Sequence, residues 1–253
     1  MRIVVFTVEN IEFVPLVLDP LLDRYASDVV RVFISRSLLS WAFLRKRLRF
    51  FVRNRYPFCI RPGDLFRYCR SKLIRRGSHR TVLDYLEHRG VQAEYIEEIR
   101  TQAIRQRLRD LRPDLFLFLP FDKIAGAEFL SIPALGTFNL HMGKLPEHRG
   151  GLSAFWVLRF GDKEAGATLH RAVLKLDAGE IVGEVRLPVE TRSMKKLMTQ
   201  TFRAAGQMVA DSIDRLEAGT WTAIDSRGRP EGYYLLPSRD DFREFYRRGC
   251  RLI

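Results

Sequence analysis

An asparagine and a histidine stand two residues apart in the stretch FNLHMGKLPEHRGG, which runs from Phe138 to Gly151. In a β-strand, residues i and i+2 project from the same face, so Asn139 and His141 would point the same way. An amide N–H can stabilise an oxyanion and an imidazole can carry a proton, and acyl transfer needs both. An asparagine that caps a turn beside an ordinary histidine would give the same pattern, so the wider sequence must decide.

The motif continues beyond this pair. Leu145-Pro146 and Arg149-Gly150-Gly151 indicate a turn, and a helix that bears Trp156 follows. Asp177 then appears in DAGEI, between two predicted strands and beside a glycine that can take a positive φ. An Asp-x-Gly is a common turn when it stands alone, so its weight comes from its place in this order of motifs.

The elements that would hold these residues alternate between strand and helix in the first part of the chain. Predicted strands occupy 2–8, 29–35, 93–96, 114–120 and 136–140, and predicted helices occupy 81–90 and 99–113. This alternation favours an α/β fold with a mostly parallel sheet flanked by helices. Asn139 and His141 would then lie at the carboxyl end of a parallel strand, where open α/β sheets hold their ligands.

The second part of the chain has a different pattern. We predict two paired strands at 166–176 and 179–189, followed by a long amphipathic helix at 193–219. A short strand is predicted at 233–237, and a last helix begins at Ser238. We therefore expect a core at 1–190, which contains a basic insertion at 36–77, and a small C-terminal strand and helix extension at 191–253.

Composition limits the class of protein. The chain has 253 residues, of which 46% are hydrophobic and 29% charged, so it can bury a substantial core. We expect no transmembrane helix, and MRIVVFTVEN reads as a first core strand rather than a signal peptide. The three cysteines lack disulfide or metal-ligand spacing, so we expect no metal and a cytoplasmic location.

The net charge of +13 is concentrated in one segment. Residues 36–76 contain thirteen Lys and Arg and a single acidic residue, and Arg45, Arg49 and Arg53 share one face of a predicted helix. The segment could present a solvated basic face, bind the phosphates of a nucleotide-linked substrate, or lie on an anionic membrane. Nucleic acid is a weaker interpretation.

The ordered set of Asn-x-His, Leu-Pro, Arg-Gly, a Trp-bearing helix, a Thr-Leu-His strand and Asp-x-Gly-x-Ile resembles the catalytic core of the folate-dependent formyltransferases. It is most similar to the sugar N-formyltransferases, such as the domain that formylates a UDP-linked amino-arabinose. The resemblance covers roughly residues 78–190 and the first strand, and it implies a formyltransferase-type Rossmann-like sheet. The chain departs from the family at Gly143, where a Ser is usual, at Ser153, where a Pro is usual, and at Gly151, where the amino-arabinose relatives carry an Arg.

The resemblance implies an enzyme that transfers formyl from 10-formyltetrahydrofolate to a primary amine. Asn139 would hold the developing oxyanion, His141 would act beside it as an acid or electrostatic partner, and Asp177 would raise the histidine pKa. It further implies cofactor-binding residues in two mainly apolar loops and at one glycine, namely Lys123, Ile124, Ala125, Val173, Leu174, Lys175, Leu176 and Gly151. No serine or cysteine is placed as a nucleophile, so the amine would attack directly.

We expect the acceptor to be an amino sugar, nucleotide-linked, whose product would serve polysaccharide biosynthesis. One alternative is a formyltetrahydrofolate hydrolase, which uses the same three residue types. Another is a formyltransferase that acts on a different amine, such as a metabolite or initiator tRNA. The tRNA enzymes carry a further C-terminal domain, for which this chain is too short. A non-catalytic, membrane-associated module is a rival from another class, and peripheral membrane contact and a homodimer through the tail strands are left open.

Overall fold

The computed structural model of the protein describes residues 1–36, 61, 63, 64, 66 and 79–253. Most of the predicted basic insertion, including Arg45, Arg49 and Arg53, lies outside the described residues. Among the helices that are described, none is both long and apolar enough to cross a membrane.

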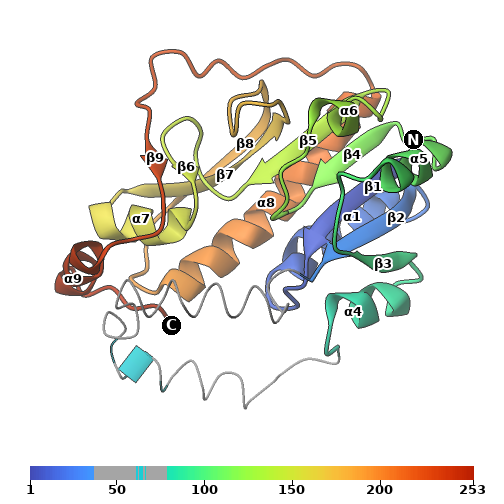
Figure 1. The fold of residues 1–253 in the computed structure, drawn as a ribbon. Helices are drawn as coiled ribbons and strands as arrows, with labels where there is room; N and C mark the ends of the chain where they lie inside the picture. The colour runs from blue at the N-terminus through green and yellow to red at the C-terminus, as the bar shows by residue number, and fades with distance from the viewer. Residues whose placement is uncertain (37–60, 62, 65, 67–78) are drawn as a thin grey trace.

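A seven-stranded sheet forms the centre of the molecule, with strand order β3-β2-β1-β4-β5-β7-β8 (Figure 1). Its strands are β1 (Ile3–Val8), β2 (Val29–Ser35), β3 (Ala93–Ile96), β4 (Leu115–Phe118), β5 (Gly136–His141), β7 (Glu164–Arg171) and β8 (Ile181–Pro188). The first five are parallel to one another, whereas β7 runs antiparallel to both β5 and β8. The expected α/β fold with a mostly parallel sheet is confirmed.

Helices cover both faces of the sheet, and the sequence of β1 shows why. Ile3 and Val5 belong to an apolar cluster with α1 (Val14–Tyr25), α4 (Val82–His88) and α8 (Met194–Glu217). Val4 and Phe6 face the other way and pack in a cluster with side chains from α5 (Gln102–Asp110) and α6 (Ala127–Leu130). A strand that is buried on both faces must be apolar at every position, which explains its continuous apolar run.

The C-terminal elements form a smaller layer beside the sheet. Helix α7 (Ser153–Phe160) packs against α9 (Arg239–Arg247), and the rings of Phe155 and Phe245 stack with centroids 4.7 Å apart. Strand β6 (Arg149–Gly150) pairs with β9 (Tyr233–Tyr234) in a separate two-stranded sheet. Ser238 caps α9 with a full capping box, as the sequence predicted.

The predicted ribbon at 166–176 and 179–189 is correct in pairing but wrong in extent. Strand β7 ends at Arg171 and β8 begins at Ile181, so residues 172–180 form a loop and not the ends of two strands. The apolar run from Val173 to Leu176 looked like strand, but Leu174 and Leu176 are exposed and lie at the mouth of a cleft. Asp177 is therefore held by a loop and not by a tight hairpin.

Helix α8 reaches α1 closely because Gly206 has no side chain. A Cβ at this position would lie 2.6 Å from the carbonyl oxygen of Leu16 and 3.0 Å from Cα of Val17. Both are backbone atoms of α1, so neither can move aside without shifting the helix. The spacing between α1 and α8 is thus fixed by this glycine.

We expect Gly206→Ala to lower the free energy of unfolding by about 1–3 kcal/mol, because overpacking displaces α1 from the sheet. Urea denaturation measures this difference. Gly126→Ala is the matched control, since a Cβ there would meet nothing within 4 Å, and we expect it to cost less. Equal effects of the two substitutions would contradict the close approach at Gly206.

Candidate active site

A cleft of about 540 Å³ opens at the carboxyl ends of β4 and β5. Phe118 from β4 and Asn139 and His141 from β5 lie in its wall, together with the loop after β4 and the loop between β7 and β8. Asp177 lines the same cleft, so the three residues that the sequence singled out are brought together. The site lies at the strand ends where open α/β sheets hold ligands.

Asn139 is oriented by a histidine on the neighbouring strand. His170 stands directly opposite it in the antiparallel pairing of β5 with β7. The carbonyl oxygen of Arg171 can only accept, and it lies 3.0 Å from Nδ1 of His170, so Nδ1 carries the proton. Nε2 of His170 then accepts a hydrogen bond of 3.0 Å from Nδ2 of Asn139. An amide has two N–H donors, and the second can serve an oxygen in the cleft.

His141 is buried, and its ring is oriented by the backbone. Nε2 donates to the carbonyl oxygen of His148 at 2.6 Å, while Nδ1 lies 3.7 Å from Oδ2 of Asp177. Burial lowers the pKa of His141 below its usual value, although the charge of Asp177 opposes that shift. His141 is therefore neutral at neutral pH. Because Nε2 is committed to a carbonyl, a proton would arrive at and leave from Nδ1.

Asp177 takes a left-handed backbone conformation, with φ of 51°, which turns its carboxylate back toward both histidines. Oδ1 lies 3.6 Å from Nε2 of His170, and Oδ2 accepts a hydrogen bond of 3.3 Å from the Gly150 amide. Burial alone would raise the pKa of Asp177, but His170, His141 and the Gly150 N–H together lower it below the usual value. The carboxylate is thus ionised at neutral pH.

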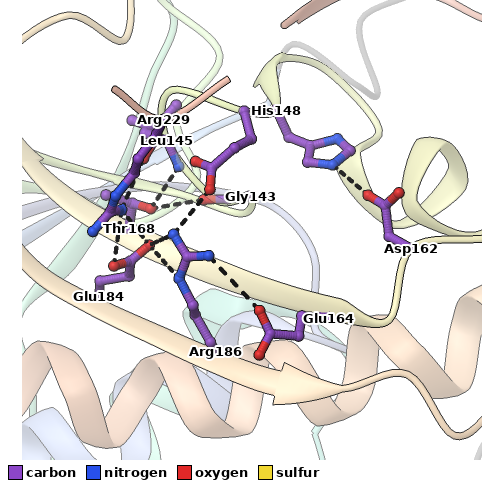
Figure 2. A network of polar contacts seen from close by, with 10 residues as sticks. Gly143, Leu145, His148, Asp162, Glu164, Thr168, Glu184, Arg186 and Arg229 are labelled. Carbon is purple, nitrogen blue, oxygen red and sulfur yellow. Dashed lines mark hydrogen bonds and ion pairs between the residues drawn. The ribbon is translucent and has the colours of Figure 1, made fainter. Parts of the chain in front are cut away.

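Thr168 of β7 lies opposite His141 of β5 and holds the loop that follows β5. Its Oγ1 donates to the carbonyl oxygen of Gly143 at 2.8 Å and accepts from the backbone N–H of Leu145 at 3.2 Å (Figure 2). The side chain of Thr168 is fully buried. The loop that carries the His148 carbonyl is therefore tied to β7.

An ionic network attaches the same loop to the C-terminal tail. Arg229 donates to the carbonyl oxygen of Leu145 at 3.3 Å and to Glu184 at 2.9 Å (Figure 2). Glu184 also pairs with Arg186, which reaches Glu164 at 3.7 Å. These residues come from the tail, β7 and β8, so several elements fix the loop before any ligand arrives.

The two departures from the family pattern in this region are in contact with each other. A Cβ on Gly143 would lie 2.5 Å from Oγ of Ser153 and 2.8 Å from Nε2 of His141. The Ser153 hydroxyl therefore occupies the space that a side chain at position 143 would take.

Most of the residues predicted to bind the cofactor line the cleft. They are Lys123, Ile124, Ala125, Val173, Leu174 and Leu176, whereas Gly151 and Lys175 are not among the described residues that line it. Ile124, Leu174 and Leu176 are 66%, 70% and 56% exposed. Apolar side chains this exposed around a cleft are suited to cover a flat, apolar ligand.

Sequence reasoning missed three groups that complete the site. These are His170, the backbone N–H of Gly150 and the backbone carbonyl of His148. The Thr-Leu-His strand was a signal for His170, but only the register of β5 against β7 shows that it faces Asn139. The two backbone groups leave no signal in the residue types.

Comparison with known proteins agrees with this geometry. Residues 72–212 match the family model described as formyl transferase, which is more than half of the chain. The chain therefore belongs to the formyl transferase family.

The curated relatives and the solved structures that resemble the chain carry names with different formyl acceptors. A methionyl-tRNA formyltransferase of Leifsonia xyli subsp. xyli is 33% identical over 147 residues, which cover 57% of this chain and 48% of the relative. The chain spans about half the length of the curated relatives it matches.

Among solved structures, the N-formyltransferase of Helicobacter canadensis in complex with folinic acid and dTDP-3-aminofucose has a TM-score of 0.62 at 15% identity. The likeness covers 96% of this chain and 79% of that one. Glycinamide ribonucleotide transformylase 1 of Symbiobacterium toebii gives 0.62 at 17% identity, with 90% and 92% covered. At such identities these likenesses show the fold alone.

We expect Asp177→Asn to lower the pKa of His141 further, because the carboxylate is the largest influence that raises it. An NMR titration of the His141 ring protons measures the shift. Asp110→Asn, on the exposed side of α5, is the control and should leave that titration unchanged. A His141 pKa that stays the same or rises in Asp177→Asn would contradict the described pairing.

We expect Thr168→Val to cost about 1–3 kcal/mol of unfolding free energy, because a buried N–H and a buried carbonyl lose their partner. Thr137→Val is the matched control: that threonine is equally buried and donates to Leu130, away from the loop. Only Thr168→Val should also speed exchange of the Nε2 proton of His141, which NMR detects. Equal proton exchange in both variants would show that Thr168 does not position the loop.

Proposed function

We propose that this protein transfers a formyl group from 10-formyltetrahydrofolate to the primary amine of an amino sugar, most simply one linked to a nucleotide. The observation that carries this proposal is the convergence of Asn139, His141 and Asp177 in one cleft with an apolar rim. The chain's membership of the formyl transferase family supports the reaction type.

The arrangement supplies what formyl transfer requires. A bond forms between the amine nitrogen and the formyl carbon, the bond to the folate nitrogen breaks, and one proton moves from the amine to that leaving nitrogen. The free N–H of Asn139 can stabilise negative charge on the formyl oxygen. Neutral His141 can take the amine proton at Nδ1, and the ionised Asp177 beside it then stabilises the imidazolium.

Residues around the cleft fit a folate. The rim offers exposed apolar side chains at Ile124, Leu174 and Leu176, which a pterin ring would cover. Backbone groups of these two loops would orient the ring edges. The bound folate would supply the formyl group, and the chain's own residues would bind it, orient it and exclude water.

The choice of acceptor rests on comparison. The Helicobacter canadensis structure is a complex with dTDP-3-aminofucose, a nucleotide-linked amino sugar, and its likeness covers nearly all of this chain. Methionyl-tRNA formyltransferase is the second candidate, because curated relatives that are 33% and 28% identical over the matched residues have that name. A homodimer, peripheral membrane contact and a substrate role for the basic segment stay predictions.

The test is to measure formation of tetrahydrofolate from 10-formyltetrahydrofolate with nucleotide-linked amino sugars, with methionyl-tRNA and with no acceptor. We expect turnover only when an amino sugar is present. Release of formate without an acceptor would instead indicate a hydrolase, and turnover with methionyl-tRNA alone would overturn the amino sugar assignment.

Variants connect this activity to the site. We expect Asn139→Ala, His141→Ala and Asp177→Asn each to lower kcat/KM by about a hundredfold or more, because each removes a group that acts in the transition state. Asp110→Asn is the control and should keep full activity. Wild-type activity in His141→Ala would exclude the proposed mechanism.

A further inference from the structure

A second group of ionisable side chains lies at the other end of the sheet. His79 immediately precedes α4, and Asp84 and His88 lie one turn apart on it. Nδ1 of His79 lies 3.6 Å from Oδ2 of Asp84, and Nδ1 of His88 lies 3.3 Å from Oδ1 of the same carboxylate. One ligand atom from each of the three residues falls within 4.8 Å of the others.

These separations are close to those of a coordinated ion. Zinc binds histidine nitrogen and carboxylate oxygen at about 2.0–2.2 Å, which places tetrahedral ligand atoms ~3.3 Å apart. The two imidazole rings also lie together, with centroids 4.6 Å apart. Little movement beyond rotation of the side chains would therefore bring all three ligand atoms around one ion.

We propose that His79, Asp84 and His88 bind a divalent transition-metal ion of the zinc class. Two imidazoles and one carboxylate favour zinc, cobalt or nickel over magnesium or calcium, which prefer oxygen ligands. Three protein ligands leave a further coordination position for water. No property of the formyl transferase site requires this ion.

An unpaired atom in the cluster points to a ligand. Nδ1 of His79 is buried and has no hydrogen-bond partner within the part of the chain that is described. A buried polar atom without a partner costs free energy, and a coordinated cation would supply the missing interaction.

The carboxylate is already oriented for coordination. Oδ2 of Asp84 accepts a hydrogen bond of 2.9 Å from the backbone N–H of Arg80. Nδ1 of His88 also lies 2.8 Å from the carbonyl oxygen of Asp84, a contact that it would give up when it turns toward the ion. Such outer contacts fix ligand orientation in metal sites.

The position of the cluster predicts what the ion does. Helix α4 lies beside β3, at the opposite end of the sheet from β6 and α7, which border the catalytic cleft (Figure 1). An ion held by residues 79, 84 and 88 would link the chain that enters α4 to the second turn of that helix. It would therefore stabilise the start of α4 and leave formyl transfer unchanged.

The test uses the full chain without an affinity tag, stripped of metal with a chelator. We expect isothermal titration calorimetry at neutral pH to show one equivalent of bound zinc, zinc to raise Tm, and magnesium to do neither. Cobalt should give the visible absorption of a site with nitrogen ligands. Absence of stoichiometric zinc binding would overturn the proposal.

Variants locate the bound ion. His79→Ala and His88→Ala should each weaken zinc binding by more than about tenfold, since even outer-sphere changes cost that much, and Tm without metal should change little. Glu87→Gln, an exposed carboxylate on the same helix, is the matched control and should bind as the wild type does. Zinc binding that persists in His79→Ala/His88→Ala and is lost in His141→Ala would place the ion in the catalytic cleft and contradict the proposal.

Discussion

The antiparallel pairing of β5 with β7 is the constraint on which the site depends. It sets Asn139 opposite His170 and His141 opposite Thr168. One cross-strand pair therefore orients the amide of Asn139, and the other holds the loop whose carbonyl orients the His141 imidazole. A shift of β7 by one residue in this register would turn Thr168 and His170 to the face opposite Asn139 and His141.

Two backbone carbonyls determine which ring nitrogens of His141 and His170 carry a proton. The carbonyl of His148 places a proton on Nε2 of His141, and the carbonyl of Arg171 places one on Nδ1 of His170. The remaining nitrogens of His141 and His170 lie 3.7 Å and 3.6 Å from the carboxylate of Asp177. A proton that reaches His141 would complete an ion pair with the carboxylate. In the proposed reaction, that proton would come from the attacking amine.

The sequence predicted the parts of the fold that follow from periodicity and the parts of the site that follow from residue type. The continuous apolar run of β1, the long apolar stripe of α8 and the start of the last helix at Ser238 were all correct. The loop at 172–180 was wrongly predicted as strand, because its exposed residues Val173, Leu174 and Leu176 are apolar and give the same pattern as a buried strand. His170 and the two backbone groups were missed because their roles depend on register, which residue types do not encode.

The most direct test of the proposed site is a crystal structure of the protein with 5-formyltetrahydrofolate, an unreactive isomer of the proposed donor. We expect the pterin to lie between the loop at 123–125 and the loop at 173–176, with the formyl end directed toward Asn139 and His141. A folate bound elsewhere on the protein, or a cleft that stays empty at saturating folate, would contradict the proposed function.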